Sequence, residues 1–85
     1  MRKDNSKQIR IQYYASLREA CKVSEEFIKT NACSPRELFQ DIKKRHHVNI
    51  SLSVLKVAIN DEFSSWDSLL NPNDTVIFIP PVAGG

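Results

Sequence analysis

The clearest chemistry in the sequence lies in its last six residues, which are all rigid or small: Pro80, Pro81, Val82, Ala83, Gly84 and Gly85. The prolines fix φ and have no N–H for a sheet ladder, so we expect this flexible tail, residues 80–85, to project away from the sheet. The glycines have no Cβ, so the end of the tail could enter a channel too narrow for any side chain. The pattern predicts that the carboxylate of Gly85 is delivered to a site on another protein.

A carboxylate must be activated before it can transfer a group, because its oxygen is a poor leaving group until it is joined to a phosphate. The sequence has no P-loop and no Ser/His/Asp set that could do this. We therefore expect a separate enzyme to consume ATP and form an acyl-adenylate, and we expect no cofactor bound to the chain itself. The alternative, a plain disordered terminus, predicts polar residues rather than PPVAGG.

Other kinds of site find little support in the sequence. His46 and His47 are adjacent, so their side chains diverge by about 100° on a helix, and neither has a metal-ligand partner at a suitable spacing. The basic run at 43–45 reads as the solvated end of a helix, so we expect no nucleic acid partner. No stretch approaches the roughly 20 apolar residues of a membrane span. Cys21 and Cys33 read as reduced packing residues of a cytoplasmic protein.

The first half of the chain predicts two strands and one long helix. Residues 8–15 alternate apolar and polar side chains, as a half-buried strand does, and residues 25–30 form a second strand whose Lys and Glu content suits a sheet edge. Residues 16–21 are compatible with a helix but too short to stand alone. Residues 1–7 are polar, and we expect them to form a flexible extension.

The strongest local signal marks the start of the long helix. Ser34 is a good N-cap, Pro35 suits the first helical position, and Glu37 completes a capping box. The helix is expected to end at the adjacent histidines. Its apolar face comprises Leu38, Phe39 and Ile42.

The second half of the chain predicts three more strands. Residues 55–59 and a short strand around residues 62–63 are joined by a turn, and residues 75–79 are apolar at nearly every position, as in a central strand. The residues expected to close the end of the core are Trp66, Leu69 and Leu70. One long helix can cover only one face of such a mixed sheet. The sequence thus predicts an α+β roll of the ubiquitin-like β-grasp kind, in one domain spanning residues 8–79.

The alternation along the last strand predicts an open apolar face. If Val76 and Phe78 face the helix, the opposite face of the sheet carries apolar side chains that the helix does not cover. A patch of this kind usually marks a partner site, and the alternative is that Trp66 or a loop folds over it. The predicted interface residues are Tyr14, Phe63, Ile77 and Ile79.

Several segments together resemble the small subunits of molybdopterin synthase: IRIQYYASLREA at 9–20, AINDEF at 58–63, NPNDTVIFIPP at 71–81 and the final PPVAGG. The resemblance implies a sulfur carrier whose Gly85 is adenylated by a ubiquitin-activating-like enzyme and converted to a thiocarboxylate with a sulfur donor enzyme. It also implies a large synthase subunit, in a 2+2 heterotetramer, where the sulfur attacks cyclic pyranopterin monophosphate to form molybdopterin. Family positions that contact partners match Phe63 and Ile79.

Three alternatives remain open at this point. A sulfur carrier for thiamin thiazole synthesis or tRNA thiolation would share the fold, the activation and the glycine pair. A ubiquitin-like protein modifier would join its tail to lysines, although an exposed modifier tail would be expected to carry charge. A plain interaction domain would have no chemistry in its tail. The chain departs from the resemblance at residues 21–23, where many family members carry glycine, and this affects only the expected turn geometry.

Overall fold

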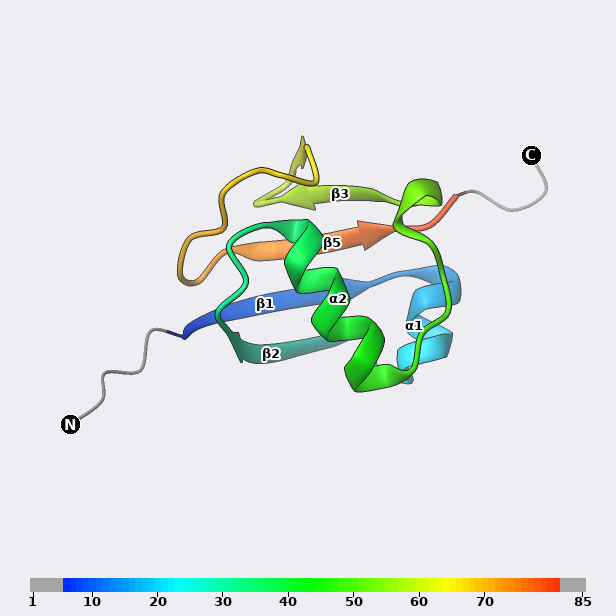
Figure 1. Cartoon of the computed structure of the whole chain (residues 1–85). Helices are drawn as coiled ribbons and strands as arrows, with labels where there is room; N and C mark the ends of the chain where they lie inside the picture. Colours follow the sequence, from blue (N-terminus) through cyan, green and yellow to red (C-terminus); the bar gives the residue numbers. More distant parts are fainter. Residues whose placement is uncertain (1–5, 82–85) are drawn as a thin grey trace.

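A mixed five-stranded sheet with one long helix across one face forms the architecture, in a computed structural model that describes residues 6–81 (Figure 1). In chain order the elements are β1 (Lys7–Tyr13), α1 (Ala15–Cys21), β2 (Glu25–Thr30), α2 (Pro35–His46), the 3-10 turn η1 (Leu52–Val54), β3 (Lys56–Ile59), β4 (Glu62–Ser64) and β5 (Thr75–Ile79). The strand order is β2-β1-β5-β3-β4. β1 and β5 are parallel, and the other neighbours are antiparallel. The predicted α+β architecture and the edge position of β2 are confirmed.

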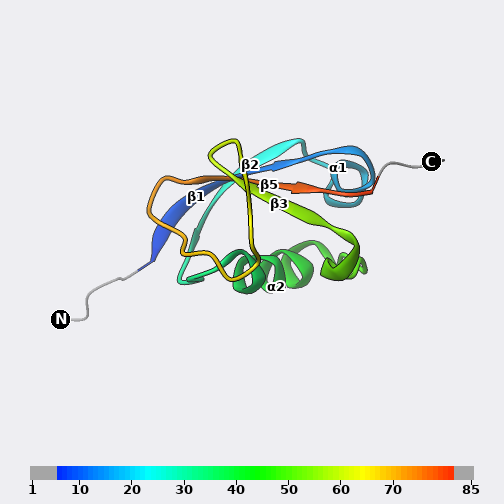
Figure 2. The same cartoon turned by 90° about the horizontal axis from the view of Figure 1, so that it is seen from above.

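The central strand β5 explains why its sequence is apolar at nearly every residue. It lies between β1 and β3, so both of its long sides are paired. The register places Ile11 beside Val76 and Tyr13 beside Phe78, and all four side chains are at most 1% exposed. Seen from above, α2 lies against one face of the sheet (Figure 2). Val76 and Phe78 therefore lie on the buried, helix-covered face, as predicted.

Helix α2 begins as its sequence predicts. The Ser34 hydroxyl oxygen accepts a hydrogen bond from the Glu37 backbone N–H at 3.3 Å, and Pro35 occupies the first turn. The Glu37 carboxylate reaches one residue further back than in a standard capping box, accepting from the Cys33 backbone N–H at 2.9 Å. The three predicted core residues of the helix, Leu38, Phe39 and Ile42, are fully buried.

Helix α1 forms despite its length of seven residues, so the predicted extension of the first strand to residue 15 is wrong. A helix this short is marginally stable alone, and here the buried side chains of Leu17 and Cys21 stabilise it by packing into the core. Lys22 ends it in the left-handed region at φ 65°. Cys21 is therefore a packing residue as predicted, whereas Cys33 is exposed and the prediction for it is wrong.

The segment between β4 and β5 closes one end of the core with two of the three predicted side chains. Trp66 stacks on Phe78 at 5.8 Å between ring centroids, and Leu70 is 2% exposed. The Leu70 N–H also donates to the Cys33 carbonyl at 2.9 Å. Leu69 is 70% exposed, so its predicted core role is wrong. In this segment the neighbouring residue Leu70 is buried, and Leu69 faces solvent.

The N-terminal boundary of the fold differs slightly from the prediction. β1 begins at Lys7, which pairs with Thr30 of β2, so Lys7 belongs to the sheet rather than to the predicted extension. Residues 1–5 lie outside the described part of the chain. Between Ser6 and Pro81, no helix combines the length and the apolar character needed to cross a bilayer.

Candidate functional site

The root of the predicted tail lies at the end of β5. The strand ends at Ile79, Pro80 is buried and Pro81 is exposed. Pro80 thus packs against the domain instead of standing away from it, and the described chain first becomes exposed after the strand at Pro81. The rest of the predicted tail, including the carboxylate of Gly85, lies outside the described residues.

A hydrogen-bonded network fixes the beginning of β5. The Asn60 side-chain amide donates to the Asp74 carboxylate at 2.9 Å, while its oxygen accepts from the Thr75 backbone N–H at 2.9 Å. The other Asp74 oxygen accepts from the Asn71 N–H at 2.8 Å. Asn60 and Asp61 both have positive φ, as a tight β3–β4 turn requires. The network ties that turn to β5, so it sets the register in which β5 carries the chain toward Pro81.

The open face of the sheet is not uniformly exposed. One row runs across it in the order Phe63, Ala58, Ile77, Gln12 and Glu25. Ile77 lies in the middle of this row and is only 9% exposed, because it is flanked by residues of both neighbouring strands. Ile77 is therefore on the predicted face, but the expectation that it belongs to a bare patch is wrong. Phe63, at the end of the row, is 74% exposed.

Two apolar side chains of this face with exposed surface, Tyr14 and Ile79, lie at the end of β5, and Phe63 lies on the outer strand β4 beside Lys56. Tyr14 follows β1, which runs parallel beside β5, and is 48% exposed. Ile79 is partly exposed and pairs with Lys56. The Lys56 ammonium lies 6.0 Å from the centroid of the Phe63 ring, so part of that ring is held by a cation–π contact. We call Tyr14, Phe63 and Ile79 the exit patch, and its role in binding a partner stays a prediction.

The alternative in which Trp66 covers the open face is wrong. The Trp66 ring stacks on Phe78 and lies 6.0 Å from the Phe39 ring, which places it on the helix-covered side. The exit patch is consequently left to solvent in the described chain.

Sequence reasoning missed Phe27, a third exposed aromatic residue on the open face. It lies on the edge strand β2, opposite Arg10 of β1, and is 59% exposed. The signal was present in the sequence, because alternation along residues 25–30 places Phe27 on the same face as Glu25 and Lys29.

A polar cluster on the other face was also missed. The Tyr13 hydroxyl donates to the Glu26 carboxylate, and His46 Nε2 lies 2.7 Å from the same carboxylate oxygen. Burial, reinforced by the Glu26 carboxylate, holds the pKa of Tyr13 well above its ordinary value. Burial likewise raises the pKa of the Cys21 thiol to about 11, with the Glu26 charge adding to the effect. The cluster joins α2 to β1 and β2, and it keeps Cys21 a protonated, poor nucleophile.

Neither this cluster nor the adjacent histidines forms a metal site in the described residues. Between residues 6 and 81, no group of three or more His, Cys, Asp or Glu side chains is placed to hold a metal ion. His46 is instead engaged with Glu26, and His47 lies in the left-handed position that ends α2.

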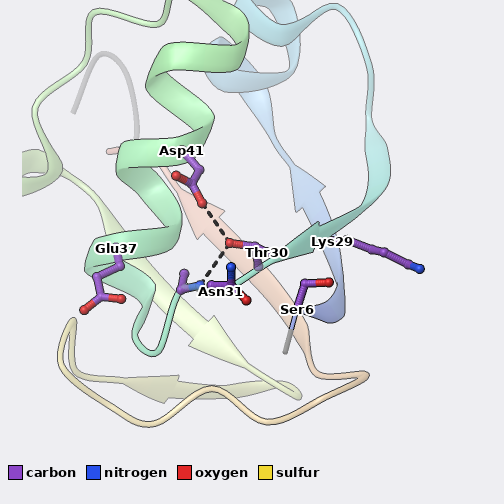
Figure 3. A pocket seen from close by; sticks show the side chains of 7 residues that line it. Ser6, Lys29, Thr30, Asn31, Glu37 and Asp41 are labelled. Atoms are coloured by element: carbon purple, nitrogen blue, oxygen red, sulfur yellow. Dashed lines mark hydrogen bonds between the residues drawn. The ribbon is translucent and has the colours of Figure 1, made fainter. Parts of the chain in front are cut away.

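A shallow groove runs between the end of β2 and the first turns of α2 (Figure 3). Three of its polar side chains, Thr30, Glu37 and Asp41, have hydrogen-bond partners within the chain. The Thr30 hydroxyl donates to the Asp41 carboxylate at 2.7 Å and accepts from the Ala32 N–H at 3.0 Å. Glu37, also in the groove, accepts from the backbone before the helix. The hydrogen bonds in the groove therefore stabilise the β2–α2 connection, and the carboxylates of Glu37 and Asp41 are both engaged in them.

Comparison with known proteins agrees with this geometry. The model of the ThiS family matches residues 11–85. A solved structure described as molybdopterin converting factor subunit 1 from Pyrococcus furiosus is 30% identical, with a TM-score of 0.75, over 91% of this chain and 100% of that one.

Two more distant structures share the fold. The small archaeal modifier protein 1 (SAMP1) of Methanosarcina acetivorans is 17% identical, with a TM-score of 0.76, over 96% of this chain and 100% of that one. A chain from the complex of subunits 1 and 2 of the molybdopterin-converting factor of Helicobacter pylori is 24% identical, with a TM-score of 0.65, over 92% of this chain and 99% of that one. The predicted β-grasp fold is thereby confirmed, and the chain belongs to the ThiS family of ubiquitin-like sulfur carriers.

Proposed function

We propose that this protein is the sulfur carrier subunit of a molybdopterin synthase. The observation that carries the proposal is the 30% identity to the Pyrococcus furiosus molybdopterin converting factor subunit 1, which extends over the whole of that chain. The final PPVAGG supports it, because those residue types suit insertion into a narrow channel better than exposure to solvent.

The proposed chemistry takes place at the carboxylate of Gly85, in the cytosol. In an activating enzyme, a carboxylate oxygen attacks the α-phosphorus of ATP and pyrophosphate leaves. Hydrosulfide supplied by a donor enzyme then displaces AMP from the acyl carbon, and a thiocarboxylate forms on Gly85. In the large synthase subunit this sulfur attacks cyclic pyranopterin monophosphate, and hydrolysis returns Gly85 to its carboxylate. Two such rounds supply the two sulfurs of the dithiolene in molybdopterin.

The folded domain supplies the handle for this chemistry. The sheet ends at Ile79 and Pro80 still packs against the domain, so the chain leaves the fold beside Ile79 of the exit patch. We propose that the exit patch docks against the large subunit, in a 2+2 heterotetramer, while the tail enters its active site. The Cys21 thiol is buried with a raised pKa, so it is a poor nucleophile and takes no part in the proposed chemistry.

The test is a two-stage reconstitution followed by mass spectrometry. The carrier is incubated with ATP, the activating enzyme and a sulfur donor, and the intact mass is expected to rise by the replacement of one oxygen with one sulfur. The loaded carrier is then mixed with the large subunit and cyclic pyranopterin monophosphate, and molybdopterin formation is measured. A chain lacking Gly85 is the control, which we expect to remain folded because β5 ends at Ile79.

Three outcomes would contradict the proposal. No mass increment would argue against a sulfur carrier, and a lysine-linked adduct would indicate a protein modifier. A loaded carrier that delivers sulfur to a thiazole synthase but not to the large subunit would place the protein in thiamin synthesis.

A further inference from the structure

The free edge of β2 carries backbone groups that no strand of the described chain uses. β2 is an outer strand, and its one neighbour is β1 (Figure 1). The Tyr13 N–H donates to the Ser24 carbonyl at 2.9 Å, so alternate residues from Ser24 onward direct their backbone groups to β1. The residues between them, Glu25, Phe27 and Lys29, direct theirs to the free edge.

The side chains of these same three residues are ordered so that two antiparallel copies of the strand place opposite charges opposite each other. Glu25, Phe27 and Lys29 alternate along β2, so they share the open face of the sheet, and all three are exposed. If a second β2 lies antiparallel with the two Phe27 residues opposite each other, each Glu25 lies opposite a Lys29. Opposite charges on directly facing residues stabilise an antiparallel pair. The sequence of the strand is therefore complementary to itself.

We propose that β2 pairs with β2 of a second copy of this chain, antiparallel about a two-fold axis at Phe27. The three outward-facing residues then form three hydrogen-bonded pairs, with about six backbone hydrogen bonds, since each such pair exchanges two. The two Phe27 rings, 59% exposed in the single chain, cover each other at the axis.

The charges also select this register over its neighbours. A shift that places Phe27 opposite Lys29 moves Glu25 opposite Asn31, which lies beyond the end of β2. That arrangement loses both charge pairs and two of the backbone hydrogen bonds. Charged side chains usually protect an edge strand from association, but here their order makes them attractive in one register. Glu25 is already engaged with Arg10 of its own chain, so the pair extends an existing ion pair.

The dimer leaves the proposed chemistry of each copy accessible. The pairing edge is at the opposite side of the sheet from β4, which carries Phe63 of the exit patch. A two-fold axis perpendicular to the sheet reverses the strand direction, so the two β5 strands end at opposite margins of the joined sheet. The two open faces lie on the same side. Each copy could then present its tail to a separate partner.

The first test uses charge reversal and its rescue. Sedimentation equilibrium is measured over a concentration series up to about 1 mM, because one strand pair is a small interface of the weak class. Lys29→Glu is expected to raise the dissociation constant of the dimer roughly tenfold, since both facing pairs become repulsive. The double variant Glu25→Lys with Lys29→Glu restores opposite charges and should recover most of the affinity. Lys44→Glu on the exposed side of α2 is the matched control and should have no effect.

The second test reads the register directly by amide hydrogen exchange. At high protein concentration the N–H groups of Glu25, Phe27 and Lys29 should become protected, because only these face the edge. The N–H groups of Glu26 and Ile28 already face β1 and should change little. A monomer at all concentrations, protection without this alternation, or a double variant no better than Lys29→Glu would each overturn the proposal. All of these measurements leave the sulfur-carrier proposal untouched, because none involves Gly85.

Discussion

The two faces of the sheet are made from the same strands but carry different tasks. Toward α2, side chains such as Ile11, Val76 and Phe78 are at most 1% exposed and form one continuous core. On the open face, apolar residues alternate with charged and polar ones, and Phe63 and Tyr14 remain exposed. The difference shows that a five-residue strand such as β5 can hold the fold with the side chains of one parity and place those of the other parity on a face that the helix does not cover.

The largest expected effect comes from truncating one aromatic residue on each face. Phe78→Ala removes a fully buried ring that contacts Phe39 and Trp66, so we expect the free energy of unfolding to fall by about 3–5 kcal/mol. Phe63→Ala removes a ring that is 74% exposed, and we expect a change within about 0.5 kcal/mol. Urea denaturation of both variants measures the contrast. Equal losses would show that the open face contributes to the core as much as the covered face does.

The next effect concerns partner affinity and depends on the proposed function. Ile79→Asp places a charge in the exit patch, and we expect binding to the large subunit to weaken by about 2–4 kcal/mol, as at an interface hot spot. Isothermal titration calorimetry measures the change. Leu69→Asp is the matched control, because Leu69 is 70% exposed but lies outside the sheet face. An unchanged dissociation constant for Ile79→Asp would move the interface away from this patch.

A third comparison uses one threonine from each face of the sheet. Thr30 is 6% exposed, and its hydroxyl joins Asp41 to the Ala32 N–H (Figure 3). Thr30→Val leaves both groups without that partner, so we expect a loss of about 1–3 kcal/mol in the free energy of unfolding. Thr75→Val, with a partly exposed side chain, should change it by less than about 0.5 kcal/mol. Thermal melts of the two variants decide the matter, and a neutral Thr30→Val would mean that water replaces the hydroxyl.

Most of the covered face could be predicted from the sequence because local rules and burial agreed there. The capping residues indicated where α2 begins. Its apolar side and the alternation of β1 indicated which side chains are buried between the helix and the sheet. α1 was missed as an element because its propensity alone does not hold seven residues in a helix. Packing of Leu17 and Cys21 supplies what the local signal lacks.

The open face was predicted less well because exposure there depends on neighbouring strands. Parity placed Ile77 on the correct face, yet only the sheet order shows that Gln12 and Ala58 flank it. The same limit applies to Pro80, whose burial could not be read from its φ preference. Distant pairs such as Glu26 and His46 were invisible for a different reason, since 20 residues of chain separate them.

The smallest effect should appear as a dependence of stability on alkaline pH that belongs to the covered face. The pKa of the Cys21 thiol is raised to about 11 in the folded chain, so the folded state keeps a proton that the unfolded state loses first. The free energy of unfolding must therefore fall as pH rises above the ordinary thiol value of about 8.5 toward 11. Cys21→Ala should flatten this decline by on the order of 1 kcal/mol between about pH 8.5 and 10, below the range in which Tyr13 contributes. Cys33→Ala removes an exposed thiol and should leave the decline unchanged. Equal flattening by both variants would show that burial of Cys21 does not cause the pH dependence.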